Sequence, residues 1–225
     1  MSTTDTRAAW LSGVDRELAW WRSYFSNEGL NDPASYHERL DPGAPLQPHL
    51  VAALPQRPPG ATFRILDCAA GPATTVGKML NDRRIEVIAV DALADQYREM
   101  LDEIALMPPV PTISCEVEHL DKQFAPKSFD LVHMRFALDH CYNPIEALRQ
   151  MTRVTRDDGA VLIEHYRDAS EVAFEGLRQW DLRPEPGDLL VANADQSFSV
   201  RDTFPDVQVN IEFSPTWLTL TLRRS

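Results

Sequence analysis

The stretch Phe63-Arg-Ile-Leu-Asp67-Cys-Ala-Ala-Gly71-Pro-Ala-Thr-Thr-Val76 decides the fold that we expect for this chain. It begins with an apolar run that ends in an acid and continues with a tight group of small residues. A pattern that predicts a helix over residues 73–81 follows. A strand, a turn and a helix N-terminus in this order form the place where open parallel sheets bind cofactors.

A second apolar run, Ile85 to Val90, also ends in an acid, Asp91. An acid at the tip of the second strand is well placed to hold the two hydroxyls of a ribose. The pair of acids, Asp67 and Asp91, therefore predicts a cofactor that contains a nucleoside. The alternative for both is that they cap turns at strand ends.

Strand patterns and helix patterns alternate through the middle of the chain, which predicts a parallel, doubly wound α/β sheet. The expected strands are residues 63–67, 85–90, 112–117, 129–133 and 160–165, with a turn at 155–159, and the expected helices are 73–81, 93–106 and 143–154. Asn143 and Pro144 suit the start of the last helix. Residues 188–200 and 207–222 then alternate like strands with no helix between them, which predicts an antiparallel hairpin at the sheet edge.

The first sixty residues differ from this pattern. Residues 10–28 predict an amphipathic helix, because Trp10, Val14, Leu18, Trp21 and Phe25 recur at steps of three and four. The stripe either packs on the core or forms a lid over the active site, and the two interpretations are compatible. The prolines between residues 33 and 48 predict a loop, and a short helix is expected over 48–54. We therefore divide the chain into an N-terminal helical extension or lid, 1–60, and a cofactor-binding domain, 61–225, with a specificity insert near 166–200 that includes a helix at 171–180.

Composition narrows the possible partners. The hydrophobic fraction of 44% and the charged fraction of 25% are those of an ordinary soluble protein. The formal net charge of −12 argues against nucleic acid and favours a small-molecule substrate. No apolar run is long enough to span a membrane, and the N-terminus does not resemble a signal peptide. The three scattered cysteines indicate reduced thiols and a cytoplasmic location.

The combined motifs resemble the class I S-adenosylmethionine (SAM)-dependent methyltransferases, of the bacterial small-molecule type. The matching segments occur in order, at Ile65–Gly71, Val87–Asp91, Cys115–Leu120, Ser128–His140 and Asp157–His165. This resemblance implies a mostly parallel seven-stranded sheet with an antiparallel C-terminal hairpin, and SAM as the cofactor. The first motif departs from the family pattern, since Ala69 and Ala73 stand where glycines are common.

The resemblance also assigns roles to individual residues. The small residues after the first strand lie against the amino-acid end of the cofactor, and the following helix offers N–H groups to its carboxylate. Glu116 accepts from the adenine amino group, while the Val117 N–H donates to a ring nitrogen. Arg135 contacts the methionine end or an acidic substrate, or else makes a surface ion pair. The residues expected to bind the cofactor are Asp67, Ala69, Gly71, Asp91, Ala92, Glu116, Val117 and Arg135.

Methylation of a hydroxyl requires a base, whereas an amine needs only to be deprotonated before attack. His140 and His165 are the candidates, because each follows a strand end that faces the expected pocket. His133 and His119 are interpreted as packing or surface residues. No metal-ligand spacing is present, so no metal site is expected.

Other functions remain open at this point. One alternative is that the chain is an enzyme of the same fold that performs non-methyl chemistry, such as cyclisation or decarboxylation. Another is that it is a non-catalytic partner subunit. An NAD-dependent dehydrogenase is disfavoured, because the chain lacks a full G-x-G-x-x-G turn. A homodimer through the aromatic N-terminal helix is a further possibility.

Overall fold

A seven-stranded sheet in the order β3-β2-β1-β4-β5-β10-β9 forms the centre of the protein. The computed structural model describes residues 3–81, 83–166 and 176–224. The first five strands are parallel, while β10 is antiparallel to both β5 and β9. The antiparallel C-terminal hairpin is confirmed, but both of its strands lie within 207–224, and residues 188–199 do not contribute to it. The strands are β1 Thr62–Cys68, β2 Arg84–Asp91, β3 Thr112–Ser114, β4 Phe129–Arg135, β5 Thr155–Tyr166, β9 Val207–Phe213 and β10 Trp217–Arg224.

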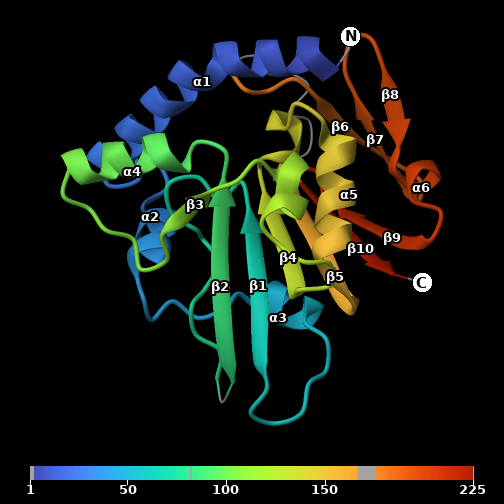
Figure 1. The fold of residues 1–225 in the computed structure, drawn as a ribbon, viewed down its shortest axis with the longest axis horizontal. Coiled ribbons are helices and arrows are strands. Elements are labelled where there is room, and N and C mark those ends of the chain that lie inside the picture. The colour runs from blue at the N-terminus through green and yellow to red at the C-terminus, as the bar shows by residue number, and fades with distance from the viewer. Residues whose placement is uncertain (1–2, 82, 167–175, 225) are drawn as a thin grey trace.

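Helices cover the sheet, and α1 lies across the carboxyl ends of β1 and β2 at the top of Figure 1. The predicted apolar stripe of α1 is confirmed as core: Trp10, Trp21 and Phe25 are buried in one cluster with residues of α4. The helices are α1 Thr3–Ser26, α2 Pro33–Leu40, α3 Pro48–Ala53, α4 Ala94–Glu103, α5 Pro144–Val154 and α6 Val200–Thr203, with the 3₁₀ helices η1 Val117–Lys122 and η2 Leu138–His140. No described helix is both long enough and apolar enough to cross a membrane.

The predicted helix over residues 73–81 is wrong, because this segment is extended. It runs beside residues 44–46, where the Ala44 carbonyl accepts from the N–H groups of Lys78 and Met79. Gly77 permits the approach, since a Cβ there would collide with the Pro45 carbonyl. The β-branched run 74–76 also has a low helix propensity. Backbone partners from a distant segment therefore replace the helix.

The loop predicted between residues 33 and 48 is also wrong in part, because it contains α2. Asp32 caps this helix by accepting from the Ser35 N–H, and Pro33 fits its first turn. The prolines that suggested a loop thus mark a helix start. The Asn143 cap of α5 is confirmed by its bond from the Glu146 N–H.

Two further differences concern the end of the chain. The turn predicted at 155–159 is part of β5, which pairs with Phe129 across an irregularity in the register. Residues 181–199 form a separate antiparallel sheet of three strands, β6 Asp181–Glu185, β7 Asp188–Ala192 and β8 Ser197–Ser199. The helix predicted at 171–180 lies partly outside the described residues, and 176–180 are not helical.

Candidate cofactor and substrate site

A cavity of about 1380 Å³ lies at the carboxyl ends of the parallel strands, beneath α1. It is larger than the roughly 300–1,000 Å³ of common small-molecule pockets, so it has room for a cofactor and a second small molecule. The cavity brings together every predicted site residue except Glu116. Its lining includes Asp67, Ala69, Gly71, Asp91, Ala92, Val117, Arg135, His140 and His165.

The turn after β1 forms one wall of the cavity. Ala69 and Gly71 both have positive φ, 52° and 68°. A Cβ at Gly71 would lie 2.6 Å from the Trp21 ring, so glycine is required there by both backbone and space. Ala69 takes the same left-handed conformation with a side chain, which costs about 1–2 kcal/mol.

Asp91 closes this turn from the end of β2. Its carboxylate accepts from the N–H groups of Gly71 and Leu93, both at 2.9 Å. Burial raises the pKa of Asp91 to about 6, although these two hydrogen bonds oppose the shift. Turn capping and exposure to the cavity are therefore combined in one side chain, and the two interpretations drawn from the sequence do not exclude each other.

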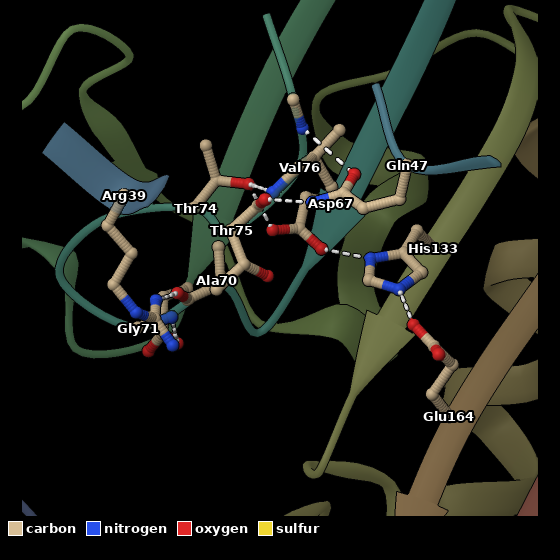
Figure 2. A network of polar contacts seen from close by, with 12 residues as sticks. Arg39, Gln47, Asp67, Ala70, Gly71, Thr74, Thr75, Val76, His133 and Glu164 are labelled. Atoms are coloured by element: carbon tan, nitrogen blue, oxygen red, sulfur yellow. Dashed lines mark hydrogen bonds and ion pairs between the residues drawn. The ribbon is translucent and has the colours of Figure 1, made fainter. Parts of the chain in front are cut away.

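Asp67 belongs to a buried chain of polar groups that crosses three strands (Figure 2). It accepts from the Thr74 hydroxyl at 2.5 Å and lies 2.8 Å from Nδ1 of His133. Nε2 of His133 lies 3.0 Å from Glu164, whose carboxylate also contacts His49 at 3.2 Å. Burial alone would lower the pKa of His133, but the two carboxylates raise it to about 9. His133 is thus a buried cation and more than the packing residue that was predicted.

Glu116 lies outside the cavity lining, in a polar cluster behind it. Its carboxylate accepts from Arg7 and from the Tyr142 hydroxyl, and it contacts His119 at 2.8 Å. The neighbouring Val117 and Glu118 do line the cavity. Burial raises the pKa of Glu118 to about 7, despite a hydrogen bond from the Asn143 N–H. The predicted adenine contact of Glu116 stays a prediction that would require the cluster to open.

Four described arginines line the cavity, namely Arg16, Arg39, Arg135 and Arg178, and the sequence suggested only Arg135. Arg135 packs over the rings of Phe136 and Trp217, at 4.9 and 5.5 Å from their centroids. Arg39, at the end of α2, lies over the Trp21 ring at 4.9 Å and donates to the carbonyls of Ala70 and Ala73. No local motif marks Arg39, because its position depends on a helix that the prolines concealed.

Part of this sequence matches a known protein family. Residues 66–163 match the family model described as a methyltransferase domain. Residues 66–163 are thus similar to a methyltransferase domain. The predicted resemblance is confirmed over that stretch, and the cofactor that this family implies is SAM.

Solved structures of low sequence identity share the fold of this chain. A SAM-dependent methyltransferase from Aquifex aeolicus is 16% identical, with a TM-score of 0.51 over 88% of this chain and 96% of that chain. The 1,6-didemethyltoxoflavin-N1-methyltransferase of Burkholderia thailandensis, with 1,6-didemethyltoxoflavin and S-adenosylhomocysteine bound, is 16% identical, with a TM-score of 0.53 over 100% and 91%. The CMeT domain of the citrinin polyketide synthase is 18% identical, with a TM-score of 0.54 over 78% and 49%. Among curated protein sequences, none is significantly similar to the chain.

The two candidate bases have different surroundings. Nδ1 of His165 donates to the Tyr166 carbonyl at 2.9 Å, and its Nε2 lies 2.9 Å from Asp139. Burial alone would lower the pKa of His165, but the Asp139 carboxylate raises it, which favours the protonated ring. His140 is 32% exposed and lies 3.9 Å from Asp139, too far for a hydrogen bond. Its ring is therefore the one with a nitrogen free to accept a proton.

The described residues contain no group of three histidine, cysteine, aspartate or glutamate side chains placed to hold a metal ion. All three cysteines are buried as free thiols. Burial raises the pKa of Cys68 and Cys141, which makes both thiols poor nucleophiles.

Proposed function

We propose that this protein binds SAM and transfers its methyl group to a hydroxyl or amine of a small molecule. The observation that carries this proposal is the pairing of the Gly71 turn with Asp91 at the carboxyl edge of a parallel sheet, in the wall of one large cavity. The match of residues 66–163 to a methyltransferase domain supports it. SAM supplies an electrophilic methyl on a sulfonium, so catalysis depends mainly on positioning and the exclusion of water.

The residues of the cavity fit the parts of this cofactor. The Asp91 carboxylate has remaining lone pairs for the ribose hydroxyls, since each oxygen accepts one backbone bond. Val117, at the start of η1, lines the cavity, and we assign it to the adenine ring. The small side chains of Ala69, Ala70 and Gly71 allow close approach of the amino-acid end to the turn. These roles are proposals that follow from position and chemistry.

His140 is the proposed base for a hydroxyl acceptor, because the buried His165 ring lies against Asp139 and the Tyr166 carbonyl, whereas His140 is 32% exposed. Asp139 lies between the two rings and stabilises the charge that His140 gains on accepting a proton. We assign His165 the role of positioning Asp139. The Burkholderia structure holds a small heterocycle beside S-adenosylhomocysteine, so heterocycles are a suitable first class of acceptor to screen.

The N-terminal extension contributes Trp10, Glu17, Trp20, Trp21 and Tyr24 to the cavity wall. We therefore propose that α1 acts as a lid, in addition to packing on the core. The homodimer through this helix and the cytoplasmic location stay predictions from the sequence.

Calorimetric titration of the full chain with SAM and S-adenosylhomocysteine tests the proposal. We expect micromolar binding, abolished by Asp91→Ala and kept by Asp95→Ala, a matched change at a 63% exposed carboxylate on α4. Acceptors that give a product heavier by one methyl establish the transfer. A product of unchanged mass would point instead to cyclisation, and a folded protein that binds neither compound would overturn the proposal.

A further inference from the structure

Several N–H groups of the segment that follows β1 already donate within the protein, whereas the first N–H groups of a helix would be free for an anion. The N–H groups of Gly71, Val76 and Gly77 donate to Asp91, the Thr74 hydroxyl and Gln47, at 2.9, 2.9 and 3.1 Å. The next two, of Lys78 and Met79, donate to Ala44. A helix at this place would have presented free N–H groups to the carboxylate of an amino acid. In this chain that carboxylate needs another partner.

Arg39 lies at the same turn. Its Nη1 donates to Ala70 and Ala73, while its guanidinium packs over the rings of Trp21 and Tyr24 at 4.9 and 5.9 Å. Its Nε is buried and makes no hydrogen bond within the described chain. Figure 2 shows the side chain running from α2 to the backbone of Ala70 and Gly71. The carbonyls of Ala70 and Ala73 hold Nη1 of the planar guanidinium, and its other nitrogens remain as donors.

No carboxylate of the described residues pairs with Arg39. Asp67 is bound to Thr74 and His133, and Asp91 is bound to backbone N–H groups. Burial lowers the pKa of Arg39, and the neighbouring charge of Arg135 lowers it further. Among the described residues, neither Arg39 nor Arg135 forms an ion pair with a carboxylate although both line the cavity, and this favours a ligand that brings its own negative charge.

We propose that Arg39 binds the carboxylate at the amino-acid end of the cofactor, in place of the missing helix N-terminus. The inference rests on the proposed SAM function. A guanidinium held by two carbonyls is oriented in advance, and its planar fork suits a carboxylate. Two of the departures from the predicted secondary structure are linked in this way: α2 carries the charge that the non-helical 73–81 segment does not provide.

The test compares two ligands that differ only in this carboxylate, SAM and decarboxylated SAM. Titrations use the full-length wild-type protein, Arg39→Gln, and Arg22→Gln as a control at an exposed arginine that pairs with Glu103. We expect Arg39→Gln to weaken SAM binding by about 10- to 100-fold, as for a charged hydrogen bond. Binding of decarboxylated SAM should change by less than about threefold. Arg22→Gln should alter neither affinity.

The outcomes separate this assignment from the proposed function. Equal weakening of both ligands by Arg39→Gln would mean that Arg39 only supports the turn, and unchanged affinities would place the carboxylate elsewhere, so either result overturns the assignment. A wild-type protein that binds neither ligand overturns the proposed function itself. If circular dichroism shows that Arg39→Gln does not fold, Arg39→Lys replaces it. Lysine keeps the charge but loses the fork, and a preference for SAM that does not decrease would contradict our assignment.

Discussion

His133 and Asp67 occupy paired positions on β4 and β1, and Nδ1 of His133 lies 2.8 Å from Oδ1 of Asp67. Glu164 on β5 approaches the other ring nitrogen at 3.0 Å. Since a neutral imidazole has only one N–H, two ionised carboxylates require the protonated ring. This buried cation holds Asp67 in the cavity wall and balances two negative charges beneath the cofactor site.

Replacement of His133 by leucine is expected to destabilise the protein by about 3–5 kcal/mol, because it leaves two buried carboxylates without their cation. Urea unfolding monitored by circular dichroism measures this loss. His119→Leu is the matched control: that ring pairs with Glu116 but is 39% exposed, so its loss should cost less than about 1 kcal/mol. A His133→Leu protein as stable as the control would show that the network does not support the fold.

The sheet could be predicted because each of its strands is recognisable from its own residues. Each apolar run from Phe63 to His165 carries its own strand signal, and the alternation with helices gives the parallel order. The edges of the cavity were predictable for the same reason, since Asp67 and Asp91 end their strands. The sequence pattern at β4 did not reveal the charge on His133, which arises only when the register places the ring between β1 and β5.

The segment that follows β1 was not predictable from its own residues. Its conformation depends on backbone partners at residues 44–46, and those residues are positioned by α2 and α3. Arg39 escaped notice for the same reason, because nothing within the sequence of α2 indicates which way its last turn faces. The errors at the 73–81 segment and at Arg39 therefore have one origin, the packing of residues 33–54 against the turn.

Gly71→Ala is expected to cost more stability than Gly60→Ala, although both glycines have positive φ. A Cβ at Gly60 meets nothing within 4 Å, whereas one at Gly71 meets the Trp21 ring at 2.6 Å. Backbone strain alone costs about 1–2 kcal/mol, and overpacking adds about 1–3 kcal/mol at Gly71. Thermal and urea unfolding of both variants measures the difference. Equal losses would indicate that Trp21 moves freely away from the turn.

Cofactor binding should depend on pH through Asp91. Burial raises its pKa to about 6, so the carboxylate that accepts the ribose hydroxyls is protonated progressively below that value. The affinity for S-adenosylhomocysteine should be constant above about pH 7 and should fall by up to about tenfold per pH unit well below pH 6. Titration calorimetry between pH 5 and pH 8 measures this. Asp91→Asn should bind weakly and without this dependence; a wild-type affinity that stays flat to pH 5 would exclude Asp91 as the titrating acceptor.

The two histidines beside Asp139 should respond differently to replacement by asparagine. If the acceptor is a hydroxyl, His140→Asn removes the base and should lower kcat by about 10²- to 10⁴-fold. It should also remove the limb of the pH–rate profile that reports deprotonation of the base. His165→Asn removes the buried ring 2.9 Å from Asp139, so it should mainly lower stability while the shape of the pH profile is kept. Steady-state kinetics with an acceptor that gains a methyl, together with urea unfolding, separates the two effects. A pH profile that changes only in His165→Asn would reverse the assignment, and a normal rate in His140→Asn would indicate an acceptor, such as an amine, that needs no base from this chain.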